Sequence, residues 1–474
     1  MKRKLYNAGL GLAISIALGS CVTPQTVVRT ENKTVSATYV GKTDTTNLTS
    51  VNWKNYFSDA TLVALIDTAL SRNQELNITL QEIEIAKNEV RARKGEYLPF
   101  VNFGAGAGVE KTPRFTRSGA VEENLQVDGK SFPEPFTDYR AGLYASWELD
   151  VWKKLRNAKK AATLRYLASI EGKNFMVTNL VAEIANSYYE LLALDNLLDI
   201  VQRNTQLQTD AFQIVKQQKE AAKVTQLAVN RFEAQLLNTK NLQYEIKQRI
   251  VETENRIHFL TGKFPTRINR NFNQFTDLKL DSIAAGIPSQ LLSNRPDIRQ
   301  AELQLAASKL DVKSARANFY PSFGITAGAG FQSFNAAYLI KPESMLYNLA
   351  GDLMAPLVNR NAIKAAYNSA NARQLQSVYD YERSILNGYL EVLNQLAKVN
   401  NFAQSYTTKA QEVDILTQSI SISNSLFTSA RADYLEVLLT QREALESKME
   451  LIEIKLKQMN ARVTIYKALG GGWN

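Results

Sequence analysis

Two long stretches with almost no helix-breaking residues constrain the fold of this chain more than any other feature. They cover residues 155–262 and 360–470, contain no Pro, and have Gly172 and Gly388 as their only internal Gly residues. Pro and Gly are the residues that most often interrupt helices. Each stretch can therefore hold two long helices joined by a turn, and the recurrence of the pattern predicts an internal repeat.

The expected helix lengths fit together. The first helix, from residue 155 to about 222, would be about 100 Å long at 1.5 Å per residue. Its return helix (225–262) gives about 55 Å, and a further helix over 288–318 adds about 47 Å. Two shorter helices laid end to end would thus match the long one. The intervening 266–287 is expected to form a linker at half height.

Four shorter segments show the period-two alternation that is typical of strands. They lie at about 99–110, 138–150, 321–332 and 345–357, with apolar residues on one face and polar residues or Gly on the other. Their length suits a transmembrane barrel strand. Four strands cannot close a useful barrel, and open sheet edges cannot face lipid. We therefore expect an α+β membrane protein in which three copies share a twelve-stranded barrel, continued by a helical coiled-coil barrel.

The two halves of the chain can be placed in register. Pro99 corresponds to Pro321 at a separation of about 222, the Arg-Asn-Ala trios at 156 and 360 are about 204 apart, and Gly262 and Gly470 are about 208 apart. The expected division is therefore a first repeat at 59–265, the linker at 266–287 and a second repeat at 288–474. In both repeats the predicted order is helix, strand, strand, helical hairpin.

The N-terminus has the pattern of an export signal. Lys2, Arg3 and Lys4 precede an apolar run that is too short to span a bilayer comfortably. The run ends in Leu-Gly-Ser before Cys21, which resembles a bacterial lipobox. We therefore expect a lipoprotein signal peptide at 1–20, lipidation of Cys21, and an extended tether over 21–58. An ordinary signal peptide with an incidental cysteine is the alternative.

The composition argues against an enzyme. A single Cys excludes an internal disulfide framework and a multi-cysteine metal site. The single His, His258, lies in an apolar helical stretch and is expected to be a packed or helix-end residue. No phosphate-binding loop, paired-His zinc motif or nucleophile elbow occurs, so no cofactor is predicted. The net charge of +10 comes from basic residues interleaved with Glu, which is typical of solvated helix faces rather than a nucleic-acid interface.

Several motifs resemble one known family. They are Asn294-Arg295-Pro296-Asp297-Ile298, Ala315-Arg316-Ala317 before Tyr320-Pro321-Ser322, and the ending Leu469-Gly470-Gly471-Gly472-Trp473. Together they resemble the TolC-like outer membrane factors, in particular the NodT/OprM/CusC-type efflux lipoproteins, over nearly all of the mature chain. Arg295, Pro296 and Asp297 are signatures of the fold in this family. Their pattern is also that of a helix N-terminus, with Asn294 as the cap.

This resemblance implies a trimeric outer-membrane barrel with a helical tunnel in the periplasm, which lets substrates leave passively. A periplasmic adaptor protein, bound to an inner-membrane pump of the RND class, would dock at the two hairpin tips. The implied contact residues are Ala222, Lys223, Thr225, Gln226 and Leu227 in the first tip, and Ala430, Arg431, Asp433 and Tyr434 in the second. Thr225 and Asp433 also suit helix N-caps.

The family closes its periplasmic end with a Leu ring and an Asp ring one turn apart. Here Leu435 occupies the Leu position, but Leu439 stands where Asp is expected. We therefore predict an apolar constriction. Two alternatives remain: an exit duct for type I protein secretion, and a lipid-anchored coiled-coil structural protein without a pore. The lipobox and the Arg-Pro-Asp-Ile element favour efflux, and the four strands count against the second alternative.

Overall fold

The computed structural model describes residues 24, 27, 29–39, 51–127, 129–278, 285–429 and 431–473. The chain forms two compact units. One contains residues 84–168 and 302–379, and the other contains 31–83, 169–301 and 380–474. Four helices have residues in both units: α4 (Gln74–Tyr97), α6 (Lys154–Glu220), α9 (Pro296–Ala317) and α10 (Asn361–Thr428).

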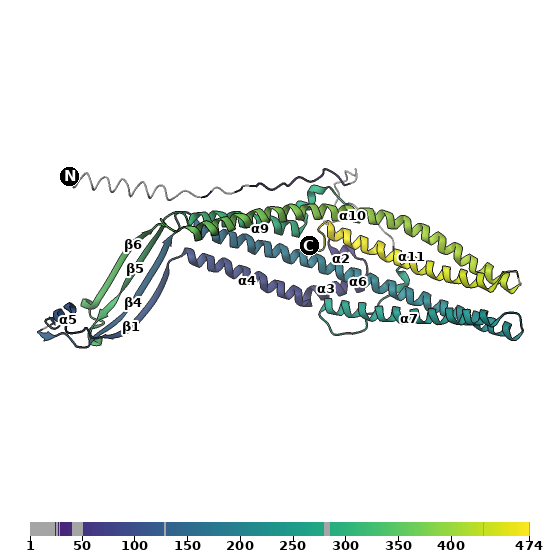
Figure 1. Ribbon diagram of the computed structural model, residues 1–474, viewed down its shortest axis with the longest axis horizontal. Helices are drawn as coiled ribbons and strands as arrows, with labels where there is room; N and C mark the ends of the chain where they lie inside the picture. The colour runs from purple at the N-terminus through teal and green to yellow at the C-terminus, as the bar shows by residue number, and fades with distance from the viewer. Residues whose placement is uncertain are drawn as a thin grey trace. The chain divides into compact units, whose positions relative to one another are not determined.

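The first unit is built on a four-stranded antiparallel sheet (Figure 1). Its order is β1 (Phe100–Glu110), β4 (Phe136–Leu149), β5 (Ser322–Ser333) and β6 (Met345–Met354). Short elements fill the connecting loops, namely α5 (Arg117–Glu122), β2 (Gln126–Val127), β3 (Lys130–Ser131) and the 3₁₀ turns η4 (Ala336–Tyr338) and η5 (Pro342–Ser344). Strands β1 and β6 form the two edges, and each has a partner on one side only among the described residues.

Glycines on the polar face of the sheet make room for large side chains of neighbouring strands. A Cβ built on Gly104 would lie 3.1 Å from the ring of Tyr144, and one on Gly106 would lie 3.3 Å from Nε of Arg140. The side chains of Tyr144 and Arg140, which belong to β4, therefore lie over the neighbouring strand β1. The alternation seen in the sequence thus separates an apolar face from a face of Gly and polar residues.

The pairs β1–β4 and β5–β6 have the same register. This register corrects part of the predicted correspondence between the two repeats. Phe100 pairs with Ser146 in one ladder, and Ser322 pairs with Met354 in the other, so the separations are 322 − 100 = 222 and 354 − 146 = 208. Helices α6 and α10 also end 208 residues apart. The predicted match of Arg156 to Arg360 is therefore wrong by one helical turn: Arg156 lies inside α6, whereas Arg360 precedes α10.

The second unit contains two helical hairpins, α6 with α7 (Gln226–Thr261) and α10 with α11 (Tyr434–Ala468) (Figure 1). Its shorter elements are α2 (Trp53–Tyr56), α3 (Ala60–Arg72), α8 (Leu291–Asn294) and the 3₁₀ turns η2 (Phe272–Gln274) and η3 (Pro288–Gln290). The largest apolar core joins α2, α3, α6 and α11, with Ile66, Ile184 and Tyr188 fully buried. Within the described ranges, no helix is long and apolar enough to cross a membrane.

Two helices expected to be continuous are broken. The first breaks at Asn73, whose buried side chain accepts from the backbone N–H of Leu76 and donates to the carbonyl of Leu260. The second breaks at Arg295, which is extended (φ −85°, ψ 117°) because the following Pro296 disfavours helical backbone at the preceding residue. Pro296 is thus the first residue of α9, and the expected cap Asn294 lies one residue too early.

Candidate functional site

The first hairpin tip is the turn between α6 and α7. Ala222 adopts a left-handed conformation (φ 56°), which is unusual for a residue with a Cβ. Thr225 caps α7 as expected, because its hydroxyl oxygen accepts from the backbone N–H of Ala228 at 3.4 Å. Lys223, Gln226 and Leu227 are exposed. The turn therefore presents one cationic, one amide and one apolar side chain to any partner.

The second tip joins α10 to α11. Ala430 lies outside the described residues, whereas Arg431 and Asp433 are described and exposed. Asp433 occupies the N-cap position of α11, but its side chain makes no capping hydrogen bond. Arg431 and Asp433 therefore expose one positive and one negative charge to solvent at the end of the hairpin.

Tyr434 differs from the other tip residues because it is partly buried. It packs with Leu438 against an apolar cluster of the first hairpin that contains Val215, Val229 and Phe232. The structure thus brings the second tip against the first through this ring. Tyr434 fixes the position of one hairpin relative to the other and leaves the charged residues to face outward.

Leu435 and Leu439 lie one turn apart on the same exposed face of α11, at 38% and 37% exposure. Val437, between them in sequence, is buried on the opposite face at 2%. The spacing of four residues aligns the two Leu side chains along the helix. The chain therefore presents a continuous apolar strip at this level of α11.

An open groove of about 630 Å³ lies further along the same hairpin, between α10 and α11. Four carboxylates line it: Glu412, Glu443, Glu446 and Glu450. Lys409 contacts Glu412 at 2.8 Å and Glu450 at 2.7 Å. Hydrogen bonds from Lys409, and then from Ser447, lower the pKa of Glu412. The surface beyond the Leu strip is therefore acidic, with one cation within it.

The signature residue Arg295 is the centre of a buried polar cluster. Its guanidinium donates to both oxygens of Asp297 (3.0 and 2.8 Å), to Glu391 at 2.8 Å and to the carbonyl of Ala468 at 2.6 Å. Burial lowers the pKa of Arg295, but the two carboxylates outweigh burial and the net pKa is raised. Gly470 (φ 96°) packs against this break, where an added Cβ would meet the Asn294 carbonyl oxygen at 2.5 Å. The motif is a structural clasp between α9, α10 and the C-terminal segment.

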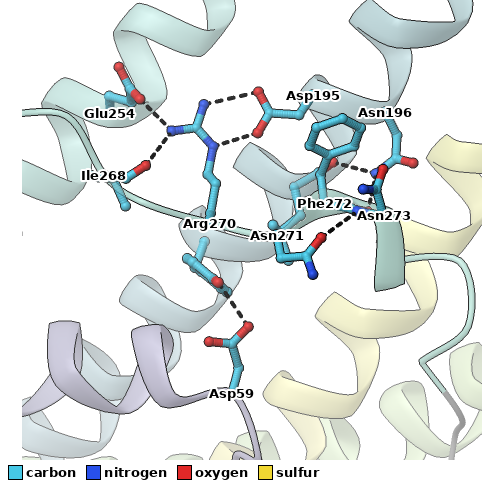
Figure 2. Close-up of polar contacts among 11 residues, drawn as sticks. Asp59, Asp195, Asn196, Glu254, Ile268, Arg270, Asn271, Phe272 and Asn273 are labelled. Carbon is cyan, nitrogen blue, oxygen red and sulfur yellow. Dashed lines mark hydrogen bonds and ion pairs between the residues drawn. The ribbon is translucent and has the colours of Figure 1, made fainter.

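A second buried cation was not predicted from the sequence. Figure 2 shows Arg270 between Asp195 of α6 and Glu254 of α7. It also donates to the carbonyl of Ile268 at 3.1 Å. Asn196 donates to the carbonyl of Phe272 at 2.9 Å (Figure 2). These contacts fix the chain that follows α7 onto the first hairpin.

His258 is a buried residue in the last turn of α7, which confirms its interpretation as a packed helix-end histidine. Its Nε2 lies 2.6 Å from the carbonyl oxygen of Thr266 and 3.1 Å from the backbone N of the same residue. No group of three or more potential metal ligands occurs among the described residues. Cys21, the expected lipidation site, lies outside them.

Known proteins resemble this chain over most of its length. The solvent efflux pump outer membrane protein SrpC of Pseudomonas putida is 28% identical over 89% of this chain and 87% of its own. The cation efflux system protein CusC of Escherichia coli O6:H1 is 26% identical over 90% and 89%. The crystal structure of a membrane protein from Pseudomonas aeruginosa superimposes with a TM-score of 0.84 at 25% identity, covering 95% of this chain and 98% of the other.

The sequence profile of the family described as "Outer membrane efflux protein" matches residues 65–263 and 287–471. These two ranges contain both hairpins, all four long strands and the Arg295 clasp. The chain belongs to the outer membrane efflux protein family.

Proposed function

We propose that this protein is the outer-membrane channel of a tripartite efflux system. In this role it is a passive exit duct for small toxic compounds. An inner-membrane pump of the RND class delivers them through a periplasmic adaptor protein. Membership of the efflux family supports the role, and relatives named for solvent, toluene and cation efflux agree with it.

The observation that carries the proposal is the sheet with two open edges. Strands β1 and β6 leave their outer N–H and C=O groups unpaired within the described chain. Such edges are costly in lipid, so the sheet must be closed by other copies. Three copies give a twelve-stranded barrel whose glycine-rich face lines the lumen, with the helices continuing as a periplasmic barrel.

The hairpin tips supply the docking surface for the adaptor. Lys223, Gln226 and Leu227 of the first tip, with Arg431 and Asp433 of the second, are exposed and offer both charges and an apolar contact. Leu435 and Leu439 form an apolar constriction when three copies meet. Lipidation of Cys21 adds a second attachment to the outer membrane.

The channel role is tested by two measurements on the full-length protein. Purified protein reconstituted in planar bilayers should insert as a trimer and produce discrete conductance steps. A deletion strain should become more sensitive to organic solvents or toxic cations, and the intact gene should restore resistance. A monomer without pores would refute the channel.

One alternative, an exit duct for secreted proteins, makes a different prediction. The deletion strain would then keep its resistance and lose a protein from the culture medium. In a further experiment, the genes of the RND-class pump and of its adaptor protein are deleted. If sensitivity does not change in that strain, the assignment of the pump class is wrong while the channel remains.

A further inference from the structure

The pairing of strands between the two repeats of one chain indicates how strands of neighbouring copies can pair. Strand β1 corresponds to β5 at a separation of 222, and β4 corresponds to β6 at 208, because the β1–β4 and β5–β6 ladders have the same register. The remaining ladder inside the chain, β4–β5, therefore joins the end of one repeat unit to the start of the next. An interface between copies must join the same two kinds of strand, β6 to β1.

We propose that β6 of one copy pairs antiparallel with β1 of the next in the register of β4–β5, so that Ala350 lies opposite Gly108. This inference rests on the proposed trimeric barrel. A closed barrel requires mutually consistent tilt and stagger around its circumference. The junction inside the chain and the junction between copies must then be alike.

The register follows from the observed pairs. Gly142 pairs with Gly330, and adding 208 to the first and subtracting 222 from the second gives Ala350 opposite Gly108. The pair Tyr144–Gly328 gives Asp352 opposite Gly106, and Arg140–Gln332 gives Asn348 opposite Glu110. On the other face the same shift places Leu349 opposite Val109 and Leu353 opposite Ala105. Apolar residues therefore meet apolar residues.

The end of β6 agrees with this register. Strand β6 stops at Met354, the counterpart of Ser146, where the β1–β4 ladder also stops. Strand β4 continues to Leu149 because β5 pairs with it on the other side. Residues 355–357 correspond to this extension and lack a partner in a single copy.

Charge complementarity is an independent observation in favour of the register. The guanidinium of Arg140 lies over Gly106, with Nε at 3.3 Å and Nη2 at 4.0 Å from a Cβ built there. It thus reaches across β1 towards the open edge. Neither Arg140 nor Asp352 has an ion-pair partner among the described residues of its own chain. The inferred register brings Asp352 of the neighbouring copy to Gly106, within reach of Arg140.

Neighbouring registers lose this pair. A shift of two residues in one direction places Asp352 opposite Gly108, whose partner on β4 is Asp138. Two carboxylates would then approach each other, which is unfavourable. A shift in the other direction places Asp352 opposite Gly104, which is covered by the ring of Tyr144. Of these three registers, the inferred one alone places Asp352 opposite Gly106, over which the guanidinium of Arg140 lies.

Cysteine cross-linking tests the register in outer membranes that contain the full-length protein. Cys21 is the only native cysteine, so introduced pairs can be followed without further substitution. The matched pairs are Ala350→Cys with Gly108→Cys, and Asn348→Cys with Glu110→Cys. The controls recombine the same substitutions as Ala350→Cys with Glu110→Cys, and Asn348→Cys with Gly108→Cys. A Cβ at Gly108 meets no atom within 4 Å, so this position accepts a side chain.

Facing residues have Cβ atoms about 5 Å apart and diagonal ones about 7–8 Å, beyond the reach of a disulfide. Under mild oxidation the matched pairs should therefore form covalent dimers and trimers at least about tenfold faster than the recombined pairs. Faster linking of the recombined pairs, or no linking in a protein that is still trimeric, overturns the register and leaves the channel intact. A monomeric protein without conductance refutes the proposed function instead.

A charge swap tests the pair between copies. Asp352→Arg and Arg140→Asp should each lower the temperature at which the trimer dissociates on gels, and the double variant should recover at least about half of the loss. If the double variant is as weak as the sum of the single variants, the two residues do not meet and the inferred contact is wrong.

Discussion

Arg270 is held almost entirely by partners that are distant in sequence. Its side chain is 11% exposed, and those of Asp195 and Glu254 are 14% and 25% exposed. Asp195 lies on α6 and Glu254 on α7, so the cluster exists only once the hairpin has formed. No periodicity or motif marks these three residues, which is why the sequence did not predict the cluster. The Arg295 clasp was predicted as a signature, but its contacts with Glu391 and Ala468 were not.

Replacing Arg270 by Met should destabilise the second unit. The substitution leaves two carboxylates partly buried without a cation, which costs about 3 kcal/mol. The Arg256→Met variant is a matched control, because Arg256 and Glu183 form a pair on the surface, at 55% and 43% exposure. The unfolding free energy of Arg256→Met should fall by less than about 1 kcal/mol. Thermal unfolding and amide exchange of residues 268–275 measure both, and equal losses would refute a special role for Arg270.

Buried and partly buried tyrosines should make the helical unit sensitive to alkali. Burial chiefly raises the pKa of Tyr189 to about 12, and burial also raises the pKa of Tyr39, Tyr188 and Tyr466. An unfolded tyrosine ionises near pH 10. The folded state therefore keeps its tyrosine protons to a higher pH than the unfolded state does. The part of the unfolding free energy that this provides is complete below pH 10 and is lost as pH rises towards 12. The loss is up to about 1.4 kcal/mol per pH unit for each tyrosine.

The Tyr189→Phe variant should show a shallower loss of stability between pH 10 and 12. Tyr244→Phe is the control, since the Tyr244 side chain is 69% exposed and should keep the wild-type pH dependence. Denaturant unfolding at several pH values measures both slopes. Identical slopes for Tyr189→Phe and the wild type would contradict the argument.

At the scale of elements, the N-terminal segment 29–39 makes a series of contacts with α10. Arg29 lies 4.3 Å from the ring centroid of Tyr379, and Glu382 accepts from the backbone N–H of Asn32 at 3.0 Å. Further along, Tyr39 stacks on Tyr389 at 5.6 Å and is 2% exposed. Residues 29–39 of the expected tether are thus attached to α10, and Tyr39 contributes the buried aromatic contact.

Tyr39→Ala should release this segment. Loss of a buried ring removes more than about 1.4 kcal/mol of local stability, so trypsin should cut after Lys33 at least about tenfold faster. Tyr379→Leu is the control, because its cation–π contact with Arg29 at an exposed site contributes only about 0.5–1 kcal/mol. Cleavage rates followed by mass spectrometry decide the matter, and an unchanged rate in Tyr39→Ala would mean that the contact does not hold the segment.

The long helices and strands were predictable because their periodicity is local. Few breakers and an apolar repeat determine α6 and α10, and strict alternation determines β1, β4, β5 and β6. The break at Asn73 was missed because it depends on the surrounding fold, through contacts that include the distant Leu260 carbonyl. The start of α9 at Pro296 agrees with the helix N-terminus that the Arg-Pro-Asp pattern indicated, but the contacts of Arg295 with Glu391 and Ala468 depend on the fold. The register of the repeat needed the observed ladders, since shifts of 204 and 208 both preserve the alternation.

At the scale of the whole molecule, packing distinguishes residues that position the hairpins from residues that face outward. Tyr434 and Leu438 pack against the cluster around Phe232, whereas Leu435 and Leu439 lie about 100° further around the axis of α11 and are exposed. A helix that is anchored on one side presents its remaining surface to solvent or to a neighbouring copy. In a trimer of the proposed kind, three such faces converge. The constriction is then set by the two Leu residues and followed by the acidic groove.

Leu435→Ser and Leu439→Ser should therefore each raise the single-channel conductance in planar bilayers. Each change replaces a large apolar side chain by a small polar one, so water and ions can enter the constriction more easily. Leu227→Ser is a matched control, because Leu227 is an exposed Leu of the first tip, 208 residues before Leu435, with no place in the apolar strip. It should leave conductance unchanged and can weaken adaptor docking alone. Equal conductance in Leu435→Ser, Leu439→Ser and the wild type would place the narrowest point elsewhere. A rise in the control would show that the first tip also lines the pore.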